Sequence, residues 1–276
     1  MKESQIRVLE YLSRFKYLSV EQMFKLGVLN NKSGIYQILK PLKEGKRNLI
    51  DLKNFGVAPV YGKLDAFYFL TKYGVQFLNS ELFYDEDIKF PIGKSTLFSR
   101  DYFHRKFTID FHINLYMFLN ANSEKLYFVD YYFDKLGSNR TNKNLRAKNH
   151  IEIAKMGAYI IPDIVFKFNI DNRDYLYLFE QHNGKDTKRL IRQLESYLLV
   201  LQSGVASIKY KFDRSVRVVV VFEHISIKNA LLERLSVTKE FQAFVNFFIF
   251  KTNDEVADNF FDGWSKIDGD KTSFIS

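Results

Sequence analysis

Residues 161–186 read IPDIVFKFNIDNRDYLYLFEQHNGKD, and this stretch decides the fold that we predict for the second half of the chain. Residues 163–170 and 175–180 favour two strands, which the turn residues Asp171, Asn172 and Arg173 would join. Asp163 begins the first strand and Glu180 ends the second, so adjacent strand ends would bring the two carboxylates together. Two carboxylates in close proximity repel each other, and a hard divalent cation relieves that repulsion.

The elements around this stretch predict a mixed sheet with a helix on either side. Apolar spacing favours helices at residues 102–119, 185–201 and around 227–235, and strands at residues 126–133, 217–222 and 247–251. The run RVVVVF at residues 217–222 is typical of a central strand buried on both faces. The order αβββαβ therefore predicts an α/β (α+β) domain over residues 101–276.

Composition excludes several classes of protein. The chain has 276 residues, a formal net charge of +9 and no cysteine, which rules out a disulfide scaffold and Cys-ligated zinc or iron–sulfur centres. A hydrophobic content of 46% argues against a disordered or collagen-like chain. There is no run of about 18 uncharged apolar residues and no apolar signal core at the N-terminus, so we expect a cytoplasmic protein with no membrane partner.

The positive charge is concentrated in two places. The first eighty residues carry 13 basic and 6 acidic groups, a net charge of +7, whereas the remaining 196 residues have a net charge of only +2. Within that remainder, residues 134–148 form a basic stretch with a single acidic residue, and its cations are Lys135, Arg140, Lys143, Arg146 and Lys148. This asymmetry favours a contact surface for nucleic acid, with a solvated face as the alternative.

The first eighty residues predict a winged helix-turn-helix. Three short helices, the second capped by Ser19, precede two strands at residues 48–54 and 65–70 and a further helix at 72–77. In a winged helix the third helix enters the major groove and the wing flanks it. The candidate DNA-binding residues are Lys32, Ser33, Tyr36, Gln37, Lys40 and Lys43 on the third helix, and Lys46, Arg47, Lys53 and Lys63 beside or in the wing. The alternative is a helical bundle that contacts protein.

Residues 81–100 are the linker that we predict between this domain and the domain over residues 101–276.

The helix predicted at residues 185–201 carries a second motif. Gln193 and Tyr197 are four residues apart, so both lie on one helical face that could turn toward the carboxylates. These two residues resemble the QxxxY pair of the RecB-like branch of the PD-(D/E)xK nucleases. In the alternative interpretation, Tyr197 belongs to the core and Gln193 is its solvated neighbour.

Taken together, these motifs resemble the MobC-type (MOBC class) plasmid mobilization relaxases and the related replication-relaxation family. The family pattern is an aliphatic residue, Pro and Asp, then an aromatic residue, two residues and ExDxGxE. Here Ile161-Pro162-Asp163, Tyr177, Glu180 and Gly184 match that pattern. His104 resembles the histidine on the first core helix of the family. His182 departs from the pattern, because it stands where the family has Asp and the broader nuclease class has Lys.

The resemblance implies a winged helix joined to a restriction-endonuclease-like core, with Mg²⁺ or Mn²⁺ as cofactor. The metal ligands would be Asp163, Glu180 and His104. His182 would ligate the metal or carry a proton, Lys185 or Lys188 would supply the missing positive charge, and Gln193 would complete the catalytic set. His104, together with the less supported His112, has an ordinary core histidine as its alternative.

The expected function is strand nicking at the origin of transfer of a plasmid or integrative conjugative element. The expected partners are double-stranded DNA and other relaxosome or coupling proteins, and the residues from 135 to 148 would hold the DNA backbone. Two alternatives remain open. One is a non-catalytic relaxosome accessory or replication or transcription regulator with a degenerate nuclease core. The other is a restriction-type endonuclease that cuts both strands.

Overall fold

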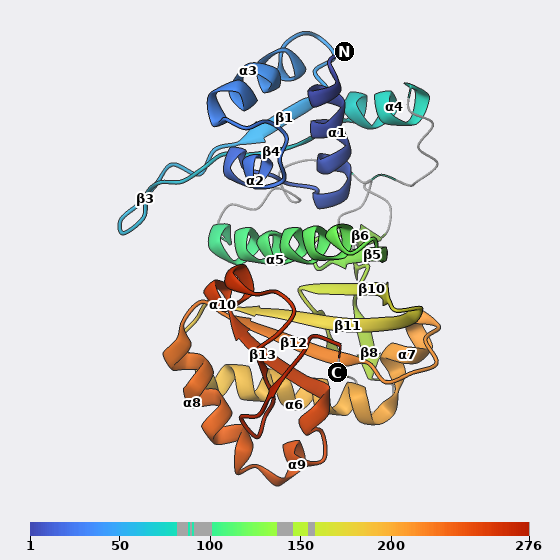
Figure 1. Ribbon diagram of the computed structural model, residues 1–276, viewed down its shortest axis with the longest axis vertical. Coiled ribbons are helices and arrows are strands. Elements are labelled where there is room, and N and C mark those ends of the chain that lie inside the picture. The colour runs from blue at the N-terminus through green and yellow to red at the C-terminus, as the bar shows by residue number, and fades with distance from the viewer. Residues whose placement is uncertain (82–87, 89, 91–100, 137–145, 154–157, 276) are drawn as a thin grey trace. The chain divides into compact units, whose positions relative to one another are not determined.

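The computed structural model describes residues 1–81, 88, 90, 101–136, 146–153 and 158–275 (Figure 1). The chain divides into two compact units, residues 1–113 and residues 114–276, which we call the first and the second unit. The architecture is mixed α/β, as predicted. None of the helices in the described ranges is both long and apolar enough to cross a membrane.

Three helices open the first unit, in the places where the sequence predicts them. They are α1 (Glu3–Phe15), α2 (Val20–Lys25) and α3 (Lys32–Lys43). Ser19 accepts a hydrogen bond from the backbone of Gln22, whose side chain bonds back to Ser19, so a complete capping box starts α2. Asn31 caps α3 through the backbone N–H of Gly34 (2.6 Å).

A small antiparallel sheet and a hairpin follow these helices. Strand β1 (Ile50–Lys53) pairs with β4 (Phe67–Leu70), and α4 (Lys72–Glu81) comes next. The sequence predicts only a turn-rich link between the two strands, but the structure forms a hairpin there from β2 (Val57–Ala58) and β3 (Gly62–Lys63). These strands have two residues each, too few to show an alternating pattern.

Helix α5 (Tyr102–Ala121) begins in the first unit and ends in the second. In the first unit, Asp110 accepts hydrogen bonds from Gln22 of α2 (2.8 Å) and from Lys106 (2.8 Å). The buried ring of His112 lies 4.5 Å from the ring of Phe15 in α1. Polar and aromatic contacts therefore attach this part of α5 to α1 and α2.

A seven-stranded mixed sheet forms the second unit. Its spatial order is β15-β14-β13-β12-β11-β10-β5. The strands are β5 (Lys125–Tyr131), β10 (Ile164–Ile170), β11 (Arg173–His182), β12 (Arg217–Phe222), β13 (Phe248–Thr252), β14 (Trp264–Ser265) and β15 (Lys271–Thr272). Strands β11, β12 and β13 run parallel, and the other pairs are antiparallel. As RVVVVF predicts, β12 is central and its valines are completely buried.

Helices follow strands β11, β12 and β13, and the sequence predicted two of them, at residues 185–201 and around 227–235. The helices are α6 (Thr187–Ser203), α7 (Val205–Tyr210), α8 (Ile225–Ser236), α9 (Lys239–Gln242), the 3₁₀ helix η2 (Val245–Phe247) and α10 (Asn253–Asp258). Leu190 and Leu194 of α6 share one apolar cluster with Val218 and Val220 of β12. Aromatic side chains build a second cluster, in which Phe168, Tyr177 and Phe274 have ring centroids 5.0–5.5 Å apart.

Two short hairpins lie between β5 and β10, where the sequence predicts a basic loop and no strand. Strand β6 (Lys135–Leu136) pairs with β7 (Arg146–Ala147), and β8 (Ile151–Ile153) pairs with β9 (Ala158–Ile160). The prediction of a loop over residues 135–148 is therefore wrong at both ends of that stretch. Arg140 and Lys143 lie outside the described residues.

Candidate functional site

Asp163 and Glu180 come together where β10 begins and β11 ends. The backbone N–H of Asp163 donates to the carbonyl of Phe179 (2.9 Å). Its Oδ2 accepts a hydrogen bond from the backbone N–H of Gln181 (2.8 Å), the residue next to Glu180. Both residues are 6% exposed. The structure therefore places two buried acidic side chains side by side, as the strand pattern predicts.

Two side chains of α6 hold the carboxylate of Glu180. The amide of Gln193 donates to Oε1, and the hydroxyl of Tyr197 donates to Oε2 at 2.7 Å. Tyr197 is completely buried, so it is a core residue and also a hydrogen-bond donor to Glu180. Burial, followed by the charge of Asp163, raises the pKa of Glu180 well above its usual value. The direction of this pKa shift reflects a carboxyl group that is buried beside a second acid.

Arg189 is a residue of this site that the sequence analysis missed. Its positive charge acts on Glu180 and opposes the rise in pKa. Arg189, Gln193 and Tyr197 follow one another at intervals of four, so they lie along one face of α6. Extending the QxxxY spacing backwards by four residues would have identified it.

His182 lies two residues after Glu180, at the last position of β11. Side chains alternate along a strand, so His182 and Glu180 point to the same face of the sheet. The ring of His182 is half-buried, 5.8 Å from that of Phe222. An imidazole that faces the same way as Glu180 therefore stands two residues beyond that acid.

Lys185 and Lys188 are exposed at the start of α6. The predicted helix begins at residue 185, but α6 begins at Thr187, because Asp186 accepts a hydrogen bond from the backbone N–H of Arg189 (3.0 Å) and caps the helix. Arg189, also exposed, is the cation near this helix start whose charge lowers the pKa of Glu180, after the larger effects of burial and Asp163 that raise it. Neither lysine is hydrogen-bonded to a carboxylate of the described site.

His104 belongs to the first unit, whereas Asp163 and Glu180 belong to the second. It is half-buried on α5, and its backbone carbonyl accepts a hydrogen bond from Thr108 (2.7 Å). His112 is 1% exposed, and burial lowers its pKa well below the usual value, followed by the nearby positive charges of Arg14 and Lys16. His112 is therefore a neutral core residue. A role for His104 as a metal ligand stays a prediction.

Asn149 connects the basic stretch to the carboxylate site, and no pattern in the sequence indicates it. This completely buried side chain donates to the carbonyl of Pro162 (2.5 Å), next to Asp163, and to that of Asp130 (3.4 Å). Lys148 forms an ion pair with Asp130 (2.5 Å), and Arg146 pairs with Glu152 (3.0 Å). The described cations of the basic stretch thus lie on a segment that is bonded to the residue preceding Asp163.

The candidate DNA-binding residues of the first unit mostly lie on the surface. Exposed residues of this set are Lys32, Ser33, Tyr36, Gln37, Lys40, Lys43, Lys46, Arg47 and Lys63, and Lys53 is half-buried. Ile35, Ile38, Leu39 and Leu42 form the buried face of α3. Lys32 already forms an ion pair with Glu21, so part of its charge is balanced within the protein.

The donor set at Asp163 and Glu180 fits a magnesium or manganese ion. Mg²⁺ is commonly bound by one or two carboxylates, with water and substrate phosphate as the other ligands. A carboxylate oxygen has two lone pairs, so an oxygen that accepts one hydrogen bond retains a site for a cation. The described residues contain no group of three or more His, Cys, Asp or Glu side chains arranged to hold a metal.

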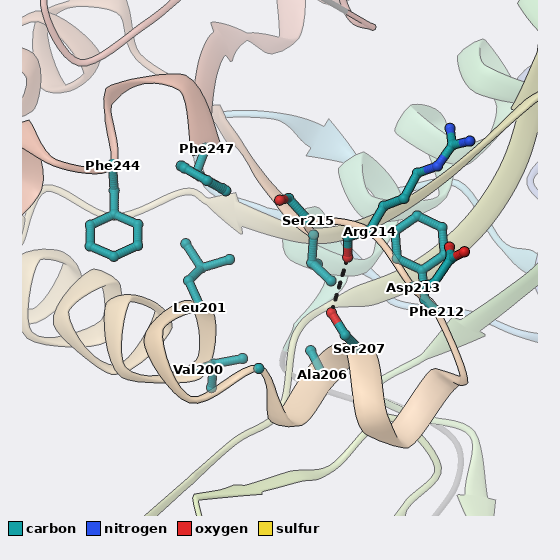
Figure 2. Close-up of a pocket in the computed structure, with 12 residues that line it drawn as sticks. Val200, Leu201, Ala206, Ser207, Phe212, Asp213, Arg214, Ser215, Phe244 and Phe247 are labelled. Atoms are coloured by element: carbon teal, nitrogen blue, oxygen red, sulfur yellow. Dashed lines mark hydrogen bonds between the residues drawn. The ribbon is translucent and has the colours of Figure 1, made fainter.

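A separate pocket of about 400 Å³ lies elsewhere in the second unit (Figure 2). It is lined by Val200, Leu201, Gly204, Ala206, Ser207, Phe212, Asp213, Arg214, Ser215, Val216, Phe244 and Phe247. Ser207 donates to the backbone carbonyl of Arg214 (3.2 Å), while the guanidinium group of Arg214 points away from Phe244 and Phe247. None of the carboxylate-site residues lines this pocket.

Comparison with known proteins found no match to this chain among family models, curated proteins or solved structures. The resemblance to mobilization relaxases therefore rests on the motif residues alone, chiefly Pro162-Asp163, Glu180 and Gly184. The geometry around Glu180 is independent of that resemblance, and it carries the functional argument.

Proposed function

We propose that this chain is a DNA-binding endonuclease that uses Mg²⁺ or Mn²⁺ to nick one strand. The observation that carries the proposal is the buried Asp163–Glu180 pair, whose second carboxylate is fixed by Gln193 and Tyr197 and faces the charge of Arg189. Two desolvated carboxylates with an adjacent cation are the groups that metal-assisted cleavage of a phosphodiester requires.

The arrangement of strands supports a PD-(D/E)xK-like interpretation of the second unit. Antiparallel β5, β10 and β11 are followed by α6 and the parallel strand β12, which is the predicted αβββαβ order when α5 is counted first. In the first unit, three helices followed by the β1–β4 pair and the β2–β3 hairpin are the element order of a winged helix. We propose that the first unit recognises DNA and the second cuts it.

Asp163 and Glu180 would hold the metal ion, which when bound would polarise a phosphate oxygen and activate water. The residues of this chain would then have distinct tasks. Gln193 and Tyr197 hold the Glu180 carboxylate in place. Arg189 adds positive charge beside the phosphate, and His182, on the same face as Glu180, carries a proton.

The biological setting is a further part of the proposal and comes from the resemblance. A winged helix would bind a site such as an origin of transfer, and the nick would start strand transfer of a plasmid or integrative conjugative element. Relaxosome and coupling proteins are the partners that this setting implies.

Nicking of supercoiled DNA that carries a cognate transfer region tests the enzymatic proposal. With Mn²⁺ we expect the wild type to yield open circles, and Asp163→Asn and Glu180→Gln to reduce the rate at least 100-fold. Asp171→Asn is the matched control, because it removes the same charge at the β10–β11 turn, where the backbone is left-handed (φ 51°) and asparagine fits. Equal rates for all four proteins would refute the proposal.

A non-catalytic DNA-binding protein is the second candidate. The observation that favours it is the histidine at position 182 where the nuclease class has lysine, together with the hydrogen bonds already made to both Glu180 oxygens. Specific gel shifts with DNA that stays intact would support this candidate. Linear product instead of open circles would indicate a restriction-type enzyme that cuts both strands.

A further inference from the structure

The β2–β3 hairpin of the first unit has an exposed apolar tip. Val57 is 75% exposed, Val60 is 86% exposed and Tyr61 is 55% exposed. Pro59, in the same turn, is exposed as well. Figure 1 shows the hairpin extending away from the β1–β4 pair. A projecting group of apolar side chains is a common mark of an interaction site.

The hairpin is held in a defined direction at its base. Val57 pairs with Lys63 and Ala58 pairs with Gly62, and the N–H of Leu64 donates to the carbonyl of Gly56 (2.9 Å). The ring of Tyr61 lies 4.2 Å from that of Phe103 on α5, within the same unit. Pro59 and Val60 are therefore presented to solvent by an anchored ribbon.

Charge identifies the kind of partner that suits this ribbon. Lys53 and Lys63 lie on either side of the apolar tip, and Asp51 and Asp65 balance their charge, so the positive charge that matters is that of the unit as a whole. The unit that carries the ribbon holds most of the excess positive charge of the chain. A polyanion that also offers an apolar interior is duplex DNA, whose stacked bases lie between two phosphate backbones.

We propose that the β2–β3 hairpin kinks DNA by inserting Val60, supported by Pro59, between adjacent base pairs. This inference rests on the DNA-binding part of the proposed function and adds a DNA-bending activity to it. Proteins that bend DNA insert apolar side chains, proline among them, at a base step and offset the unstacking through a wider contact surface. Lys53 and Lys63 would contact the phosphates on either side of the kink.

Energy transfer between dyes at the two ends of a duplex measures such a kink. The probe is a duplex of about 30 base pairs with TA and CA steps, which unstack most readily. Binding of the wild type should raise the transfer efficiency, and Val60→Ser should remove at least half of that rise at saturating protein. Val237→Ser is the matched control, because Val237 is 80% exposed in the second unit. It should bend DNA as the wild type does.

A second measurement separates the kink from simple contact. A duplex with one mismatched, already unstacked step should bind the wild type about 5-fold or more tightly than the matched duplex, and Val60→Ser should lose that preference. Binding without bending, or unchanged bending by Val60→Ser, would overturn the hairpin proposal and leave DNA binding intact. Failure of the wild type to bind either duplex would overturn both. A dimer that Val60→Ser dissociates, with bending unchanged, would assign the tip to a second copy of the chain.

Discussion

At the scale of single residues, Glu180 is a buried acid of β11 that two side chains of α6 hold. A carboxylic acid that is 6% exposed is costly unless its oxygens are bonded, and Gln193 and Tyr197 supply those bonds. Asp163 adds a second acid, and the positive charge of Arg189 opposes the rise in the pKa of Glu180. An apolar core would be the simpler way to fill this volume, so the buried acids point to a functional use.

Replacing Tyr197 by phenylalanine should destabilise the protein through Glu180. The change removes the hydroxyl that donates to Oε2, and it leaves the buried oxygen without that bond, so we expect a loss of about 1–3 kcal/mol in the free energy of unfolding by urea. Tyr210→Phe is the control, because the Tyr210 hydroxyl is buried and makes no hydrogen bond within the described part of the chain. Equal losses for the two variants would contradict the role assigned to Tyr197.

His112 should make the stability of the protein fall in mild acid. Its pKa is lowered in the folded state by burial, so below about pH 6.5 the unfolded chain binds a proton that the folded chain does not. Stability should therefore decrease as pH falls from 7 to 5.5, by at most about 1.4 kcal/mol per pH unit from this residue. Urea unfolding of His112→Leu should show a shallower decrease, and slopes equal to those of the wild type would contradict the assignment.

At the scale of elements, the site depends on connections that join distant segments. The segment before β8 is bonded to the segment before β10 through Asn149, and α6 is bonded to β11 through Gln193 and Tyr197. Both connections converge on the residues at the ends of β10 and β11. The segments that carry Asp163 and Glu180 are therefore held by hydrogen bonds from two other parts of the second unit.

Asn149→Ala should weaken this framework. It leaves the buried carbonyls of Pro162 and Asp130 without their amide donor, and we expect a loss of about 2–3 kcal/mol in urea unfolding. Asn246→Ala, an exposed asparagine in η2, is the control and should change stability by less than about 0.5 kcal/mol. If Asn149→Ala lowered the free energy of unfolding no more than the control does, the hydrogen bonds of Asn149 would not stabilise the fold.

Sequence periodicity predicted the long elements of the structure well. It predicted the helices of the first unit, the β10–β11 pair and the central β12. These elements were predictable because their apolar spacing or β-branched runs extend over at least four residues. The β2–β3, β6–β7, β8–β9 and β14–β15 pairs were missed, because strands of two or three residues show no period. Asn149 was missed since its partners lie 13 and 19 residues away in the chain. Arg189 was missed although it continues the four-residue spacing of Gln193 and Tyr197 toward the start of α6.

At the scale of the whole molecule, most of the excess positive charge belongs to the first unit, and the buried pair Asp163 and Glu180 belongs to the second. The first unit carries an exposed basic helix and a projecting hairpin, whereas the second carries two buried acids and a nearly balanced surface. This division suits a protein in which one unit recognises a polyanion and the other binds a cation. The proposal depends above all on a divalent-cation site formed by Asp163 and Glu180.

The most direct test of this cation site is thermal unfolding with and without Mn²⁺. A cation that binds only the folded protein raises the melting temperature as its concentration rises above Kd. We predict that millimolar Mn²⁺ raises the melting temperature of the wild type and of Asp171→Asn by several degrees, and that of Asp163→Asn and Glu180→Gln by less than one degree. The same increase in all four proteins would contradict the account.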